Sequence, residues 1–153
     1  MAGPAADVYV TREALESKPK PPVLTTPESA VRSYLDWVSY AYRIANSDVA
    51  SPTMTASEGV HVDALGIQYN LEQFRLIDQT LTSITFGKPS IKGNKAVLSA
   101  KEKWDYRYVS IKTAGKTVGG PYSASYDTTY TLVRSGKAWV VDSVAAKPLG
   151  TVK

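Results

Sequence analysis

The chain has 153 residues, of which 43% are hydrophobic and 21% are charged, and it contains no cysteine. This length fits one domain, and the lack of cysteine excludes disulfides, thiolate metal sites and cysteine nucleophiles. No run of 18 apolar residues is present, so the sequence offers no membrane-spanning helix.

Residues 1–26 are predicted to be a flexible, proline-rich tail or linker. The run Lys18-Pro19-Lys20-Pro21-Pro22 favours extended polyproline geometry, because proline cannot continue a helix or a central strand. We expect this lead-in to be mobile and to add little stability, so that deleting residues 1–22 leaves the melting temperature nearly unchanged. The domain itself is predicted to span residues 27–149, followed by a short tail over residues 150–153.

Two helical stretches are predicted next. Thr26 is a favourable N-cap, Pro27 suits the first helical position and Glu28 suits the positive end of the dipole. Apolar residues then recur at helical spacing to about residue 46. A second stretch is predicted over residues 57–79, with Gly66 as its weak point. Its expected inner face is Val60, Ala64, Ile67, Leu71, Phe74 and Ile77.

After Leu81 the pattern changes to the two-residue period of strands. Strands are predicted over residues 83–86, 95–112, 122–134 and 137–144, with a hairpin turn at Gly93-Asn94 and a glycine-rich connection over residues 115–121. In residues 95–112 the even positions are mostly apolar and most odd positions are charged, so the even face is predicted to be buried. Helices followed by such strands indicate an α+β fold with a curved antiparallel sheet.

Three stretches carry a resemblance to a known fold: residues 27–35, residues 81–86 and residues 130–144. The last is the most specific, because a strand is followed by a tight turn at Gly136-Lys137 and then by Trp139-Val140-Val141. This ending resembles the NTF2-like superfamily, and the likeness covers about residues 27–146. It implies an α+β cone of about four to six strands wrapped around a long first helix, and it speaks to fold more than to function. Within the superfamily, the spacing is most similar to extracytoplasmic accessory domains of envelope and conjugation proteins, many of which bind protein partners.

The net charge of +4 is distributed unevenly. Residues 27–86 hold three basic and seven acidic residues, whereas residues 88–118 hold eight basic and two acidic residues. The basic segment is of a kind that meets phosphates or anionic headgroups, but its lysines alternate with core residues. We therefore interpret them as the solvated face of a strand and expect no nucleic-acid binding.

Glu102 is the most informative polar residue, because it lies in the middle of the predicted buried face. A buried carboxylate needs partners or stays neutral. Tyrosine hydroxyls are one source of partners, and Arg32, Arg43 or Arg75 is the other; a bend that turns Glu102 to solvent is a further alternative. The candidate ligand-binding or pocket residues are Glu102, Trp104, Tyr106, Tyr108, Tyr126 and Tyr130. Ketosteroid isomerase-like enzymes of the superfamily use a carboxylate and a tyrosine in the cone, but no pair here matches their motif, so no catalytic residue is assigned.

The only histidine, His61, stands two residues before Asp63. Positions two apart on a helix do not face each other, and no second histidine or thiolate is present. We therefore expect a surface or helix-end histidine, no metal site and no cofactor.

The favoured function is a non-catalytic binding or assembly domain of a membrane- or envelope-associated protein. Its partner would be another protein or a second copy, with a small hydrophobic ligand also possible, and it would meet a membrane only through a tether outside this chain. The expected location is extracytoplasmic, with the cytoplasm as the alternative. A small-molecule-binding or isomerase/cyclase-like enzyme that uses the cone is the alternative function. A deep polar pocket with Glu102 and at least two tyrosine hydroxyls would favour that alternative.

Overall fold

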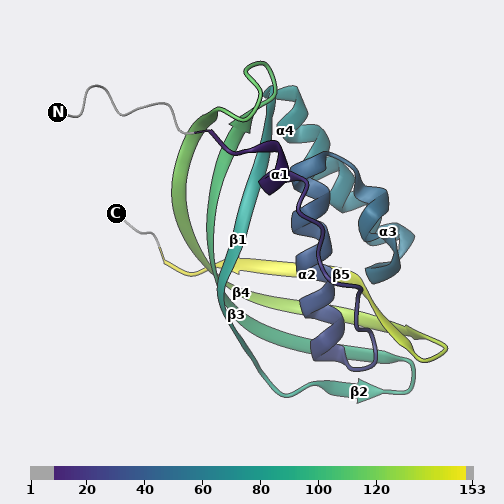
Figure 1. The fold of residues 1–153 in the computed structure, drawn as a ribbon. Helices are drawn as coiled ribbons and strands as arrows, with labels where there is room; N and C mark the ends of the chain where they lie inside the picture. The colour runs from purple at the N-terminus through teal and green to yellow at the C-terminus, as the bar shows by residue number, and fades with distance from the viewer. Residues whose placement is uncertain (1–8, 151–153) are drawn as a thin grey trace.

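The computed structural model describes residues 9–150 and has the predicted α+β architecture. A long helix, α2 (Pro27–Ile44), lies against the concave face of a curved antiparallel sheet (Figure 1). The sheet has five strands in the order β1-β3-β4-β5, with β2 paired to β3. The strands are β1 (Arg75–Phe86), β2 (Ser90–Lys92), β3 (Lys95–Ser110), β4 (Thr117–Ser135) and β5 (Ala138–Pro148).

Helix α2 begins where the sequence predicts. The Thr26 side chain accepts a hydrogen bond from the Ser29 backbone amide, and the Ser29 hydroxyl accepts one from the Thr26 amide, so a capping box closes the first turn. The helix ends at Ala45, whose φ of 54° is left-handed. The buried side of α2 packs onto inward residues of the sheet, among them Leu98, Tyr130 and Leu132.

The second helical stretch begins about where the sequence predicts but ends earlier. The structure has a 3₁₀ segment, η1 (Ser47–Thr53), then α3 (Ala56–His61), a π-helical turn, η2 (Val62–Gln68), and α4 (Tyr69–Glu72). Ile67 is buried as predicted, whereas Val60, also expected inside, is 66% exposed and Val62 is buried. The helix predicted over residues 57–79 is therefore wrong beyond Glu72, because Arg75 onward pairs with β3 and Phe74 makes the turn with a φ of 57°.

The predicted alternation along β3 is confirmed from Ala96 to Trp104, where every even residue is buried. Register shifts after Tyr106 then bring Val109 and Ser110 inside, so Tyr106 and Tyr108 are only half-buried. The predicted connection over residues 115–121 is wrong from Thr117 onward, because β4 already begins there. Glycine permits this: a Cβ at Gly120, where φ is 90°, would lie 2.9 Å from the Tyr106 carbonyl oxygen.

The described part of the predicted tail is packed against the domain. Residues 9–24, which we call the strap, include a short helix, α1 (Arg12–Leu15), and run beside α2 (Figure 1). Tyr9 pairs with Lys116, Val10 is buried, and Trp37 donates to the Lys20 carbonyl. The sequence predicts a mobile spacer here, because prolines cannot donate backbone hydrogen bonds. In the structure, side chains of α2 donate hydrogen bonds to carbonyl groups of the strap. Residues 1–8 and 151–153, the rest of the two predicted tails, lie outside the described residues.

Within residues 9–150, no helix is long and apolar enough to cross a membrane.

Candidate binding site in the cone

A cavity of about 420 Å³ lies between α2 and the concave face of the sheet. All six pocket residues predicted from the sequence line it: Glu102, Trp104, Tyr106, Tyr108, Tyr126 and Tyr130. They come together because β3 and β4 are antiparallel neighbours, with Glu102 directly opposite Tyr126. The other lining residues are Tyr34, Leu35, Val38, Tyr42, Ile77, Gln79, Thr128, Val144 and Ala146.

Glu102 is buried at 4% exposure, and both of its carboxylate oxygens accept hydrogen bonds from aromatic side chains. The Trp104 indole Nε1 donates to Oε1 at 2.8 Å, and the Tyr130 hydroxyl donates to Oε2 in a short hydrogen bond. A tyrosine hydroxyl is thus one observed partner of Glu102, as one of the sequence alternatives expected. The Trp104 indole is a second partner that the sequence did not indicate. The carboxylate does not turn to solvent.

None of the three candidate arginines pairs with Glu102. Arg32 lies over the Phe86 ring, Arg43 donates to carbonyls of the strap, and Arg75 donates to Asn70 and stacks on Tyr108. These contacts draw each guanidinium away from the centre of the cone. The interior of the cavity therefore holds its carboxylate through neutral donors.

A second buried tyrosine–carboxylate pair lies beside the first. The Tyr34 hydroxyl donates to Glu58 Oε2 at 2.5 Å, and the Tyr34 ring meets the Tyr130 ring edge-on at 6.3 Å between centroids. Burial and then the Glu58 charge raise the pKa of Tyr34 well above its ordinary value. Burial and then Glu102 do the same to the pKa of Tyr130. Both phenols therefore stay protonated donors at neutral pH.

Sequence reasoning missed this second pair because Glu58 and Tyr34 stand 24 positions apart on different helices. One local signal was available: Glu58 stands three residues after Thr55, a spacing typical of a helix start. Thr55 is indeed the N-cap of α3, and its side chain accepts a hydrogen bond from the Glu58 backbone amide. Burial raises the pKa of Glu58, against the lowering effects of Tyr34 and His61. His61 Nδ1 lies 3.7 Å from Glu58 Oε1 at the end of α3, and the side chain is 65% exposed, as expected for a helix-end histidine.

The mouth of the cavity is an aromatic cluster of Tyr106, Tyr108 and Tyr122. Their ring centroids lie 5.4 to 6.3 Å apart, and the Arg75 guanidinium lies 3.7 Å from the centroid of Tyr108. Tyr122 is 48% exposed, so the cluster is open to solvent on one side. This edge of the cone can receive an apolar or aromatic group.

Thr128 Oγ1 is a fully buried oxygen of the cavity wall. The residue is 3% exposed, and Oγ1 has no hydrogen-bond partner of good geometry among the described residues. Its hydroxyl nevertheless lies close enough to Tyr130 to oppose the rise in the pKa of that phenol. A small ligand with one polar atom would find a donor and acceptor here.

The carboxylate of the cone cavity accepts from two donors, and among residues 9–150 the lining includes no histidine, lysine or arginine. Among residues 9–150, no group of three or more histidine, aspartate or glutamate side chains is arranged to hold a metal ion. The cavity is lined by Glu102 together with tyrosines such as Tyr126 and Tyr130. This combination is the one that the sequence ties to the small-molecule-binding or isomerase/cyclase-like alternative, and the bonds that Glu102 already accepts from Trp104 and Tyr130 speak for the binding function.

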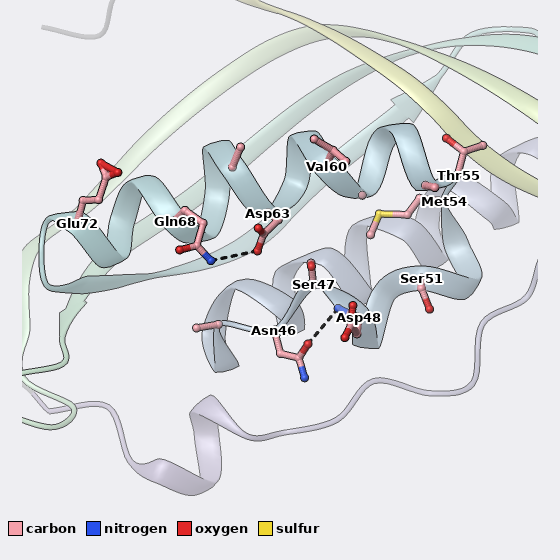
Figure 2. Close-up of a pocket in the computed structure, with 14 residues that line it drawn as sticks. Asn46, Ser47, Asp48, Ser51, Met54, Thr55, Val60, Asp63, Gln68 and Glu72 are labelled. Atoms are coloured by element: carbon pink, nitrogen blue, oxygen red, sulfur yellow. Dashed lines mark hydrogen bonds between the residues drawn. The ribbon is translucent and has the colours of Figure 1, made fainter.

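A larger hollow, of about 940 Å³, lies on the helical side of the molecule (Figure 2). We call it the helical groove; one wall comes from Asn46, Asp48 and Ser51, and the other from the run that carries Val60, Asp63, Gln68 and Glu72. Gln68 Nε2 donates to Asp63, and Asn46 caps η1 by accepting from the Asp48 amide. Its lining contains three carboxylates and no basic residue.

No family model matches this chain, and no curated protein matches its sequence. Solved structures match its fold. The intermembrane space region of the chloroplast protein ARC6 is similar with a TM-score of 0.68 and 13% identity, covering 86% of this chain and 100% of that one. A periplasmic fragment of TraM is similar with a TM-score of 0.54 and 10% identity, covering 80% of this chain and 95% of that one.

An NTF2-like superfamily protein from Salmonella enterica is similar with a TM-score of 0.54 and 11% identity, covering 84% of this chain and 96% of that one. At such low identities, these likenesses concern the fold. They agree with the cone described above: a long helix against a curved antiparallel sheet that ends in Trp139 and its strand. This chain has the NTF2-like α+β fold, and it shares that fold with an intermembrane space region and a periplasmic fragment.

Proposed function

We propose that this chain is a non-catalytic binding or assembly domain that serves a membrane- or envelope-associated protein outside the cytoplasm. The observation that carries the proposal is the state of Glu102, whose two oxygens are held by Trp104 and Tyr130. A general base must reach a substrate proton, and this carboxylate is committed to the chain's own donors. The intermembrane and periplasmic neighbours support the location.

The helical groove is the proposed surface for a protein partner. Its walls carry Asp48, Asp63 and Glu72 without a balancing cation, and Val60 stands on its rim at 66% exposure. Acidic walls favour a partner segment that carries lysine or arginine.

A photo-crosslinking experiment tests this surface. A crosslinking amino acid at Val60 should capture one partner from the native host, and Asp48→Lys with Asp63→Lys should abolish the capture. The matched control places the same group at Thr129, which is exposed on the opposite, convex side of the sheet. Equal capture from Thr129, or capture that survives the two charge reversals, would remove the helical groove from the proposal.

Thr128 favours a second candidate function, the binding of a small hydrophobic ligand with one polar atom in the cone. Such a ligand should raise the melting temperature of the parent, and Thr128→Val should reduce that rise because it removes the unpartnered hydroxyl while keeping the shape. Apolar ketones and alcohols are suitable probes. Equal melting-temperature shifts in the parent and in the variant would place the ligand elsewhere.

A further inference from the structure

The strap is bound to α2 by side chains that recognise its backbone. Arg43 donates from Nε to the Leu15 carbonyl at 3.1 Å and from Nη2 to the Ser17 carbonyl at 2.7 Å. Trp37 Nε1 donates to the Lys20 carbonyl at 3.0 Å. Ser33 Oγ accepts from the Val23 amide at 2.8 Å and donates to the Val23 carbonyl at 3.2 Å.

Ser33, Trp37 and Arg43 share one face of α2 with Tyr40, and we call this face, on which the strap lies, the strap groove. Their spacing of four, three and three places them on one face of the helix. The Trp37 and Tyr40 rings meet edge-on at 5.8 Å, and Arg43 lies 5.6 Å from the centroid of Tyr40. As α2 runs from Ser33 to Arg43, the bound strap residues run backwards from 23 to 15, so strap and helix are antiparallel.

The bound segment has the features of a polyproline strand. Residues 17–24 have no helical or sheet assignment, and Pro19 and Pro22 are half-buried while Lys18, Lys20 and Pro21 are exposed. A polyproline II helix has three residues per turn, which turns positions three apart to the same side. Lys18 Nζ also lies 5.8 Å from the centroid of the Trp37 ring. An aromatic wall whose indole N–H donates to a carbonyl beside prolines is a mode of peptide recognition.

We propose that the strap groove is a binding site for proline-rich, lysine-bearing segments of a partner protein, and that the strap occupies it in cis. The contacts supporting this are to backbone carbonyls and one backbone amide, so they accept any segment with the same proline spacing. A tethered segment has an effective concentration of about millimolar, so the strap excludes a free peptide until the partner competes or the strap is released. The strap groove lies on a different face from the helical groove, and the inference does not depend on it.

The test opens the strap groove in the full-length chain. Residues 18–22 are replaced by Gly-Ser-Gly-Ser-Gly, which keeps the length and leaves α2 unchanged. A fluorescent peptide with the sequence of residues 13–25 then probes the groove by anisotropy. We expect the opened chain to bind this peptide at least about tenfold more tightly than the parent does, because the cis competitor has lost its prolines and lysines and holds the site less firmly. A peptide with Pro19→Ala and Pro22→Ala should bind neither protein.

Two further variants keep the result interpretable. In the opened chain, Arg43→Gln and Trp37→Phe should each weaken peptide binding. Trp37 is buried, so circular dichroism must show that Trp37→Phe is folded; if it is not, Arg43→Gln alone carries the test. Failure of a folded, opened chain to bind the peptide would overturn the proposal, as would binding that survives both variants. The parent could also form a concentration-dependent dimer that Trp37→Phe abolishes. That result would overturn the proposal of a separate partner and show that two copies exchange their straps.

Discussion

At the scale of single residues, the cone is organised by two tyrosine–carboxylate pairs, Tyr130 with Glu102 and Tyr34 with Glu58. A buried carboxylate is costly unless donors surround it, and donors to a charged group contribute more than neutral ones do. Here the donors are two phenols and one indole. These bonds explain why an acid is tolerated in the middle of an apolar face of β3.

Tyr130→Phe removes one of the two bonds to Glu102 and leaves the ring in place. We expect a loss of about 1–3 kcal/mol in the free energy of unfolding, because a buried hydrogen-bond acceptor loses one of its two donors. The matched control is Tyr126→Phe, since the Tyr126 hydroxyl has no hydrogen bond within the described residues. Urea denaturation of both variants measures the difference; equal losses would show that Glu102 does not depend on Tyr130.

Glu58 makes stability depend on pH. Burial raises its pKa in the folded state above the unfolded value, so the folded chain prefers the protonated acid. Protonated Glu58 stabilises the folded chain fully at a pH below the pKa of this side chain in the unfolded chain. This stabilisation is lost as the pH rises through the higher pKa that Glu58 has in the folded chain. Glu58→Gln should therefore remove a fall in melting temperature between acid and neutral pH. An unchanged pH profile in the variant would contradict this assignment.

At the scale of elements, the helical run after α2 owes its phase to the π turn. Gly66 lies in that turn against the Tyr42 ring: a Cβ at this position would lie 2.1 Å from ring carbon Cε1. Asn70 completes the end of the run by donating to the Gly66 carbonyl and accepting from Arg75.

Gly66→Ala should destabilise the chain by about 1–3 kcal/mol, because an added methyl group forces the Tyr42 ring to move. Gly59→Ala is the matched control in α3, where the nearest atom to an added Cβ is Met54 Cε at 3.5 Å. That change should be neutral or stabilising by up to about 1 kcal/mol, as alanine is the better helix former. The melting temperatures of Gly66→Ala and Gly59→Ala measure the difference. Equal destabilisation would mean that the Tyr42 ring does not restrict the side chain at position 66.

The sequence predicts the strap to be a mobile spacer, whereas in the structure its carbonyls accept hydrogen bonds from α2. Arg43→Met removes both of its anchors at Leu15 and Ser17, and we expect a loss of about 1–2 kcal/mol, or about 2–8 °C in melting temperature. Arg12→Met is the control, because the Arg12–Glu16 pair is exposed and spaced by one helical turn. A strap that is only a spacer would give the same small effect for both variants.

At the scale of the whole molecule, most of the architecture could be predicted from local signals. The Thr26 cap, the two-residue period of β3 and the Gly136-Lys137 turn before Trp139 are properties of neighbouring residues, and each is where it was expected. The predicted pocket residues meet because strand alternation and antiparallel pairing decide which side chains share a face. The cone therefore follows from periodicity.

The remaining features depend on contacts between distant residues. Residues 75–79 fit a helix by spacing but form a strand because β3 is available to pair with them. Residues 117–121 resemble a loop by composition, yet glycine is what lets β4 pass close to Tyr106 and Tyr108. The strap is ordered by Ser33, Trp37 and Arg43, which no local pattern connects to the prolines.

The proposal that Glu102 does no proton chemistry is tested by steady-state turnover of ketosteroids and polyketide-like ketones by the parent and by Glu102→Gln. We expect no turnover above background in either protein, with the variant still folded because glutamine keeps the shape and the acceptor for Tyr130. Turnover in the parent that vanishes in a folded Glu102→Gln chain would overturn the non-catalytic proposal and assign Glu102 to proton transfer.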